Sequence, residues 1–435
     1  MFEKLYEFFK DKRVLILGLG REGRSTLDIL RKIPCTIGIS DKNLVVTDDI
    51  KAYELYSGDS YLDCLGKFDI IMKSPGIALF NDVSAEIKGR ITSQTDLLLK
   101  YCSNTIIGIT GTKGKSTTSS LTYHILKNCG RDTLLIGNIG VPPLERIGDF
   151  KKDTVIVCEM SCHQLEYVSA SPDISVLLNV FEEHLDHYVD FSAYKAAKEN
   201  IYKYHTAQNT LIINKELINP DIPSEIITAS LTDKADICLS EETLTAGSTE
   251  IPIKAIKTKL IGRHNLYNIG IAVFIAEKLG CRTDDILKAV ESFNGLTHRL
   301  ENIGTFNGVQ YINDSISTCP STAIAAVRAF DKTDTLIIGG MDRGIDYREL
   351  TDFINASDIE NIILLPDSGF RIYDDLDSSK RRIIKASDLK EAVKTAKEIT
   401  KIRCILSPAA ASYGFYKNFE ERGEHFRQLV TEAAD

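Results

Sequence analysis

The stretch Thr105-Ile-Ile-Gly-Ile-Thr-Gly-Thr-Lys-Gly-Lys-Ser-Thr117 decides the fold of this 435-residue chain. Its apolar, β-branched first half predicts a buried strand, and the glycine loop after it leads into a helix. Gly111 and Gly114 allow backbone N–H groups to turn toward phosphate oxygens. Lys115 adds a positive charge, and the hydroxyl of Ser116 is a suitable ligand for Mg²⁺. The pattern predicts a nucleoside-triphosphate site.

The loop departs from the strict P-loop pattern, which has glycine where this chain has Ile109. The shorter form Gly-Thr-x-Gly-Lys-Ser fits it better. An ordinary strand, turn and helix with a chance lysine is the alternative, and the ordered occurrence of strand, loop, Lys-Ser and helix disfavours it.

Composition limits the class of protein. The length suggests about three domains, and the net charge of −9 argues against a nucleic-acid or anionic membrane surface. The apolar runs are strand-sized, so we expect no transmembrane helix. The N-terminus, Met1 to Lys10, mixes acids with aromatics and is expected to be a docking helix rather than a signal peptide. Ten cysteines without paired spacing indicate reduced thiols in the cytoplasm.

A βαβ unit begins the chain. We expect a strand at 13–17, the loop Gly18-Leu-Gly-Arg-Glu-Gly23, a helix near 24–31 and a strand at 35–40. The glycines match a dinucleotide fingerprint, and Asp41 lies where an acidic residue accepts a ribose hydrogen bond. A UDP-sugar, NAD or a purely structural turn all remain compatible with this loop.

The rest of the chain repeats the alternation of strands and helices, which predicts parallel sheets covered by helices. We expect strands at 154–159, 174–180, 210–214, 309–313, 335–339, 361–365 and 403–406, short strands between 230 and 257, and helices at 265–279, 322–330 and 389–400. The predicted fold is α/β with three consecutive domains at 1–102, 103–297 and 298–435.

Polar groups gather after two central strands, where parallel sheets bind ligands. Glu159 and His184 are placed to share a cation; with a triphosphate nearby, Mg²⁺ is favoured over a hydrolytic metal cluster of His184, Asp186 and His187. The alternative interpretation is that these polar residues cap a loop or are charges on the surface. Lys195 and Lys198 are neighbours on one helix, and the sequence alone predicts that both are solvated.

The ordered motifs together resemble the Mur ligases, and in particular their glutamate-adding members, over essentially the whole chain. The motifs are Gly111 to Thr117, Gly137-Asn138-Ile-Gly140, Glu159-x-Ser161, Glu183-His184-x-Asp186, Lys198, His264-Asn265-x-x-Asn268, His298-Arg299-Leu-Glu301, Asn313-Asp314-Ser315 and Ser407 to Gly423.

The resemblance implies an acid–amino-acid ligase that uses ATP. In this family ATP phosphorylates the carboxylate of UDP-N-acetylmuramoyl-L-alanine, and the amine of glutamate attacks the acyl phosphate. Cations must lie where the two anions meet. The resemblance assigns this role to Lys115 and to Mg²⁺ held by Ser116, Glu159, Ser161, His184 and Lys198, the last as a carbamate formed with CO₂.

The resemblance also implies the binding residues. For ATP these are Gly111, Thr112, Lys113, Gly114, Lys115, Ser116, Thr117, Asn265, Asn268, Arg299 and Asp314. For the UDP substrate they are Gly18, Arg21, Glu22, Asp41, Lys42, Ser74, Asn138 and Ser161, so that the first fingerprint holds UDP within a Rossmann-like domain. For glutamate they are Thr318, Arg343, Ser412, Tyr413 and Phe419 in a second Rossmann-like domain after the central P-loop-type ATPase domain.

Three positions depart from the family pattern. Arg343 replaces the usual lysine and can grip a carboxylate bidentately. Ile316 stands where many members have lysine, and a related subgroup with isoleucine uses L-glutamate, so both enantiomers stay open. Lys113 replaces asparagine and can add a phosphate contact.

Four alternatives compete with this interpretation. Another Mur-type amino-acid ligase shares the ATP core, whereas a folylpolyglutamate synthase would lack the first hundred residues. An NAD-dependent oxidoreductase would leave the triphosphate machinery unused. A noncatalytic binding module would not keep Lys115, Glu159, His184 and Lys198 together. We expect a cytoplasmic monomer whose last domain closes on ATP.

Overall fold

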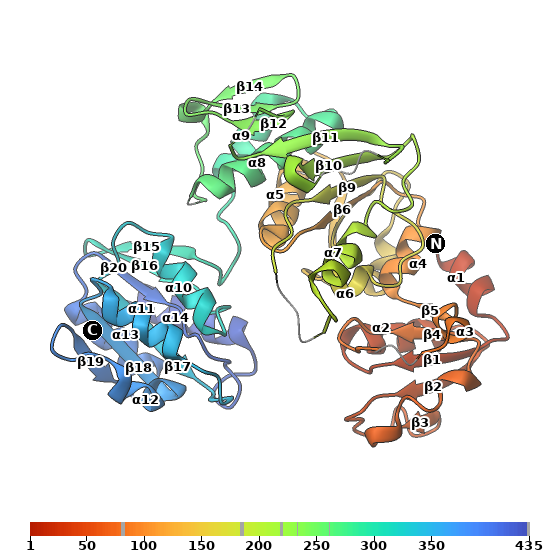
Figure 1. The fold of residues 1–435 in the computed structure, drawn as a ribbon, viewed down its shortest axis with the longest axis horizontal. Coiled ribbons are helices and arrows are strands. Elements are labelled where there is room, and N and C mark those ends of the chain that lie inside the picture. Colours follow the sequence, from red (N-terminus) through yellow and green to blue (C-terminus); the bar gives the residue numbers. More distant parts are fainter. Residues whose placement is uncertain (80–82, 183–186, 218–220, 233, 261, 433–435) are drawn as a thin grey trace. The chain divides into compact units, whose positions relative to one another are not determined.

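The structure is a computed structural model that describes residues 1–79, 83–182, 187–217, 221–232, 234–260 and 262–432. The chain divides into two compact units, each described by itself. Unit 1 comprises Met1–Thr258 and Arg263–Ser292, and unit 2 comprises Lys259–Gly262 and Phe293–Asp435. The described strands form three sheets (Figure 1), and their α/β organisation confirms the predicted fold class.

The first sheet, in unit 1, is parallel and has the order β3-β2-β1-β4-β5. Its strands are β1 Arg13–Leu17, β2 Thr36–Ser40, β3 Glu54–Tyr56, β4 Ile70–Lys73 and β5 Ile91–Thr92, with helices α1 Phe2–Phe9, α2 Arg21–Leu30, α3 Ala85–Lys88 and α4 Gln94–Tyr101. Because side chains alternate along a strand, Val14 and Ile16 of β1 join one core and Leu15 and Leu17 join the other. Helix α1 buries Leu5 and Phe9 in the first of these cores, which confirms the predicted docking helix.

The second sheet of unit 1 has the order β14-β13-β12-β11-β10-β9-β6-β8-β7 and is parallel from β7 to β12. Its strands are β6 Ile106–Thr110, β7 Thr133–Gly137, β8 Val155–Glu159, β9 Ile174–Leu177, β10 Thr210–Asn214, β11 Glu225–Ser230, β12 Ile237–Leu239, β13 Thr243–Ala246 and β14 Thr249–Pro252. The accompanying helices are α5 Lys115–Asn128, α6 Cys162–Leu165, α7 Phe191–Glu199, α8 Arg263–Lys278 and α9 Thr283–Ser292. The phosphate loop follows β6, inside the parallel part of the sheet.

Unit 2 contains the third sheet, of order β15-β16-β20-β17-β18-β19, in which only the β15–β16 pairing is antiparallel. The strands are β15 Glu301–Phe306, β16 Val309–Asn313, β17 Thr335–Gly340, β18 Asn361–Asp367, β19 Arg382–Lys385 and β20 Arg403–Leu406. The helices are α10 Pro320–Arg328, α11 Arg348–Ala356, α12 Ser368–Arg371, α13 Leu389–Ile399 and α14 Phe419–Thr431. Helices α10 and α11 pack on one face, and α13 and α14 pack on the other (Figure 1).

Several element boundaries differ from the sequence prediction by one to three residues, and two of them lie beside glycine loops. Helix α2 begins at Arg21 rather than near 24, because the glycine loop itself ends at the N-cap, Gly20. Strand β9 ends at Leu177 rather than at 180, because Asn179 turns back to accept a hydrogen bond from the N–H of Thr112 at 2.9 Å. Each boundary is set by contacts of a glycine loop, and the periodicity of apolar residues does not predict such contacts.

The three predicted domains stay a prediction, since unit 1 contains the first predicted segment and most of the second. All ten cysteines are free thiols. Within the described ranges, no helix has the length and apolar character needed to cross a bilayer.

Candidate active site

The glycine loop lies between β6 and α5. Gly111 has a φ of 155° and Gly114 a φ of 87°, conformations that favour glycine. A Cβ on Gly111 would come within 2.9 Å of the Leu178 side chain, and one on Gly114 within 3.0 Å of Asn268 Oδ1. Helix α5 starts at Lys115, so the N–H groups of its first turn face the loop, as an anion site requires.

Two lysines donate to the same backbone oxygen of this loop. The Nζ of Lys115 lies 2.8 Å from the carbonyl oxygen of Gly111 and 3.0 Å from that of Thr112. The Nζ of Lys198, on α7, lies 2.9 Å from the Gly111 oxygen. Two cationic groups around one oxygen repel each other, so the pair suits a site that receives anions.

The burial of Lys198 differs from what the sequence alone predicts. It is 1% exposed and its Nζ lies 4.7 Å from the centre of the Tyr194 ring, so the prediction of a solvated side chain is wrong for this residue. The reason is that α7 turns this position toward the phosphate loop, a tertiary contact that helical spacing does not encode. Lys195 is partly solvated as predicted, with 41% of its side chain exposed and Glu199 at 3.8 Å.

Glu159 ends β8 directly beside the loop, because its register partner on β6 is Ile109. The side chain is fully buried. Its Oε1 accepts a hydrogen bond from Nδ2 of Asn138 at 2.6 Å, whereas Oε2 has no hydrogen-bond partner among the described residues. A buried carboxylate oxygen without a partner is a feature that a bound cation satisfies, and Mg²⁺ prefers oxygen ligands. The residues present therefore fit Mg²⁺.

Of the other predicted metal ligands, the structure describes Ser161 but not His184. Ser161 is the N-cap of α6 and forms a capping box with Gln164, whose N–H lies 3.2 Å from the Ser161 hydroxyl. His184 and Asp186 lie outside the described residues. Within the described ranges, no group of three or more His, Cys, Asp or Glu side chains is arranged to hold a metal. His187 instead contacts Glu166 at 2.5 Å through Nε2.

Helix α8 brings the predicted residue Asn268 to the loop, and Asn265 lies beside Asn268. Asn268 is 4% exposed, its Oδ1 is the atom closest to the Cβ position of Gly114, and its Nδ2 donates to Oδ1 of Asn265 at 3.0 Å. The preceding residue, Tyr267, donates its hydroxyl to the carbonyl of Leu178 at 3.1 Å. This helix is thereby fixed against the loop.

The first glycine loop is also built as a tight turn. Gly18 has a φ of 91°, and a Cβ on Gly23 would lie 2.1 Å from the Gly18 carbonyl oxygen. The hydroxyl of Ser74 donates to that oxygen at 2.8 Å. The Asp41 carboxylate accepts hydrogen bonds from the N–H groups of Leu19 and Asn43, at 2.8 and 2.9 Å, so it holds the turn.

Three further residues predicted to bind the UDP substrate make contacts of their own. Arg21 donates to the carbonyl of Gly140 at 3.2 Å, two residues after Asn138 in sequence. Glu22 accepts a hydrogen bond from Gln164 at 2.9 Å, and burial raises the pKa of this carboxyl. Lys42 is exposed and pairs with Asp59 at 3.4 Å.

The predicted glutamate residues lie in unit 2. Arg343 donates to the carbonyl of Thr318 at 3.4 Å, and Ser412 is buried beside the exposed Tyr413. Phe419 begins α14, and its carbonyl accepts the Ser315 hydroxyl at 2.8 Å. These groups come from separate loops at one end of the third sheet.

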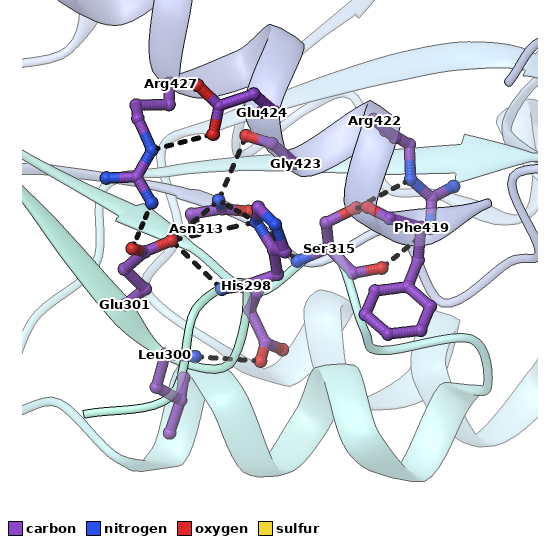
Figure 2. Close-up of polar contacts among 11 residues, drawn as sticks. His298, Leu300, Glu301, Asn313, Ser315, Phe419, Arg422, Gly423, Glu424 and Arg427 are labelled. Carbon is purple, nitrogen blue, oxygen red and sulfur yellow. Dashed lines mark hydrogen bonds and ion pairs between the residues drawn. The ribbon is translucent and has the colours of Figure 1, made fainter. Parts of the chain in front are cut away.

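Arg422 organises these loops and was not singled out as a site residue, although the motif that ends at Gly423 contains it. The side chain is 2% exposed and donates to the hydroxyl and to the carbonyl of Ser315, at 3.0 and 2.8 Å (Figure 2). It also donates to the carbonyl of Ala410 at 3.0 Å. Burial lowers its pKa to about 10. The guanidinium thus joins α14, which begins at Phe419, to the loops that carry Thr318 and Ser412.

His298, Asn313 and Gly423 interlock beside this arginine. Asn313 Nδ2 donates to His298 Nδ1 at 2.9 Å and to the Gly423 carbonyl at 3.1 Å (Figure 2).

Two residues of unit 2 that are predicted to bind ATP, Asp314 and Arg299, differ in exposure. Asp314 is 3% exposed and accepts the hydroxyls of Ser317 and Ser407, and burial raises its pKa to about 6, whereas Arg299 is exposed.

The phosphate loop, the buried carboxylate and the parallel sheet define an α/β enzyme that handles a nucleoside triphosphate. Residues 109–276 match the family model of the Mur ligase middle domain. Curated relatives align with the whole chain, and the chain belongs to the Mur ligase family. The resemblance found in the sequence is confirmed, and a nicotinamide-dependent oxidoreductase does not fit this family.

Two relatives are named UDP-N-acetylmuramoylalanine--D-glutamate ligase. The protein of Clostridium botulinum strain Langeland is 34% identical, over 99% of this chain and 98% of the relative, and that of Clostridium kluyveri is 33% identical, over 99% of both. Solved structures share the fold at lower identity. The MurF ligase from Thermotoga maritima in complex with ADP has a TM-score of 0.56 at 19% identity, covering 98% of this chain and 96% of that one. The UDP-N-acetylmuramate-alanine ligase MurC from Thermotoga maritima has a TM-score of 0.56 at 17% identity, with coverages of 95% and 98%.

Proposed function

We propose that this protein joins D-glutamate to UDP-N-acetylmuramoyl-L-alanine at the expense of ATP, in the synthesis of peptidoglycan precursors in the cytoplasm. The names of relatives aligned end to end support the reaction. The observation that carries it is the buried Glu159 with one oxygen lacking a described partner, beside a loop where Lys115 and Lys198 donate to one carbonyl. This arrangement suits a place where two anions meet.

The chemistry has two steps. A carboxylate oxygen of the acceptor bonds to the γ-phosphorus of ATP while the bond to the β-phosphate oxygen breaks, which releases ADP and leaves an acyl phosphate. The glutamate amine then bonds to the acyl carbon, the carbon–oxygen bond to phosphate breaks, and the nitrogen loses a proton. The carboxylate is a poor electrophile until its oxygen can leave as phosphate, so the first step makes the second possible.

Each residue contributes positioning or charge. Lys115 neutralises phosphate oxygens, the N–H groups of the loop and of α5 orient them, and Asn138 holds Glu159 by its Oε1. When bound, Mg²⁺ supplies positive charge between the two anions. The residues that would hold it are Ser116, Glu159, Ser161, His184 and Lys198 as a carbamate.

Carbamylation of Lys198 fits its surroundings. The ammonium group loses one proton, the neutral amine forms an N–C bond to CO₂, and the nitrogen loses a second proton, which turns a cation into an anion. Because Lys115 and Lys198 share the Gly111 oxygen, this change replaces a repulsive pair by an attractive one. Burial of Lys198 protects the carbamate from bulk water.

The three predicted domains divide the work in this proposal. Residues 1–102 hold the UDP moiety, residues 103–297 hold ATP and residues 298–435 hold glutamate, in a protein that acts as a monomer. Arg343 provides a guanidinium for a glutamate carboxylate. Ile316 leaves one fewer cation at this site, so L-glutamate is the alternative amino acid.

A coupled ADP assay with D- and L-glutamate side by side tests the proposal. We expect ADP release only when Mg²⁺, the UDP-muramoyl-alanine acceptor and D-glutamate are all present. Release with L-glutamate alone would transfer the assignment to the alternative amino acid. The absence of turnover with either enantiomer, in folded protein, would reject the function.

A further inference from the structure

Lys73 is a buried lysine to which the proposed mechanism gives no role. It is the last residue of β4, and 2% of its side chain is exposed. Its Nζ lies 3.1 Å from Glu166 Oε2 and 3.4 Å from the Pro75 carbonyl, and it also lies 5.4 Å from the centre of the Tyr167 ring. Lysines are seldom this buried unless they are paired. A buried ion pair contributes little net stability, because desolvation opposes the attraction, so stability alone does not account for it.

The pair joins two parts of unit 1 that are 93 residues apart in sequence. On one side, Lys73 adjoins Ser74, whose hydroxyl holds the Gly18 carbonyl of the first glycine loop. On the other side, Glu166 is the C-cap of α6, a helix whose N-cap is Ser161. The ion pair is therefore a direct link between the predicted UDP loop and the end of β8.

Glu166 is itself held from a second direction. Its Oε1 accepts the Nε2–H of His187 at 2.5 Å, while Oε2 faces Lys73. The ring of His163, on α6, packs against that of His187 with centroids 4.1 Å apart. With both carboxylate oxygens engaged, Glu166 has a single orientation, and so does the Lys73 side chain that it binds.

We propose that Lys73 is a positioning residue that, through Glu166, sets the distance from the nucleotide loop at Gly18 to the reaction centre at Glu159. The inference rests on the proposed function. A substrate held by its UDP end at Gly18 must bring its carboxylate to Glu159, and small errors in that distance lower the rate strongly. Lys73 acts through Ser74 and Glu166 and touches no reacting atom.

The test compares Lys73→Met with Lys51→Met. Lys51 lies in the same α/β part, but its side chain is 66% exposed and it pairs with the exposed Asp48 at 3.0 Å. We expect Lys73→Met to lower kcat/KM for the UDP-linked acceptor at least about tenfold, with the Kd of ATP unchanged within about twofold. Lys51→Met should match the wild type.

Glu166→Gln is a second variant that tests the same ion pair. It removes the negative charge that faces Lys73 and keeps a side chain of the same shape. We expect a similar loss in this variant, and the double variant with Lys73→Met should be no worse than the more impaired single variant, as for two residues of one unit. Unchanged acceptor kinetics in Lys73→Met, or an equal loss of acceptor and ATP binding together with a lower Tm, would overturn the proposal.

Hydrogen exchange separates this inference from the proposed function. Without substrates, Lys73→Met should speed exchange at both 74–77 and 161–166, and Lys51→Met should speed neither. If the wild type shows no ligase turnover, the proposed function fails, and exchange still decides whether Lys73 links the two segments. Unchanged exchange in both segments would contradict the link.

Discussion

Lys115 and Lys198 lie 83 residues apart in sequence and donate to one acceptor, the carbonyl oxygen of Gly111, at 2.8 and 2.9 Å. The oxygen belongs to the turn between β6 and α5, so two helices direct their cations at a single point of the phosphate loop. In the mechanism that we propose, this arrangement gives the buried lysine on α7 a role at the phosphate site.

Lys198→Ala should lower kcat at least about a hundredfold, because it removes both the buried amine and the carbamate that we propose forms on it. Short carboxylates such as acetate should restore part of the rate by supplying an anion in the vacated space. Lys195→Ala, at a partly exposed position on the same helix, is the matched control and should be near wild type. A full rate in Lys198→Ala would show that no carbamate is needed.

Glu159→Gln should raise the Mg²⁺ concentration for half-maximal rate about tenfold or more, since an anionic oxygen facing the proposed cation becomes neutral. Titration of the ADP-release rate with MgCl₂ measures this change. Glu250→Gln, on the exposed face of β14, should leave the Mg²⁺ dependence unchanged. Equal Mg²⁺ dependence in the wild type and Glu159→Gln would remove Glu159 from the metal site.

His205 gives the stability of unit 1 a pH dependence. Its ring is buried between the Ser175 and Ser224 hydroxyls, at 2.8 and 3.0 Å, and burial lowers its pKa from 6.5 to about 4. As the pH falls, the unfolded chain therefore binds a proton at this ring near pH 6.5, whereas the folded chain binds it only near pH 4. The contribution of His205 to the free energy of unfolding is fully present above pH 6.5 and is lost as the pH falls from 6.5 to 4.

Urea unfolding followed by circular dichroism at several pH values should show this loss in the wild type. His205→Gln can keep one hydroxyl contact but does not titrate, so its stability should change less over the same window. If both proteins show the same slope between pH 4 and 6.5, His205 is not the group responsible.

Gly423→Ala should destabilise unit 2 by about 1–3 kcal/mol, because the new Cβ would lie 2.2 Å from His298 Nδ1. Thermal unfolding measures the effect. Gly66→Ala is the control, since a Cβ there meets no atom within 4 Å. Equal Tm values for the wild type and Gly423→Ala would mean that the His298 ring can move away from the new Cβ without loss of stability.

Local sequence patterns predicted much of the fold. Strands β1, β10, β16 and β20 have the bounds expected from their apolar runs, because residues buried on both faces of a parallel sheet leave a continuous signal. The glycine loops were also predictable, since Gly111 and Gly114 adopt conformations that other residues rarely do.

Long-range contacts explain what the sequence did not reveal. The burial of Lys198 depends on how α7 packs, and the Lys73–Glu166 pair forms only after two sheets have come together. Arg422 lies in a recognisable motif, but its function in joining α14 to two loops follows from carbonyl groups that any sequence has. Such contacts carry no local periodicity.

The most direct test of the central claim follows an oxygen atom. If the acceptor carboxylate attacks the γ-phosphorus of ATP, acceptor labelled with ¹⁸O in that carboxylate will transfer one labelled oxygen to each phosphate released with product. Mass spectrometry of the phosphate should find one ¹⁸O per molecule in the presence of D-glutamate. Unlabelled phosphate accompanying amide formation would contradict an acyl phosphate and the account of the site built on it.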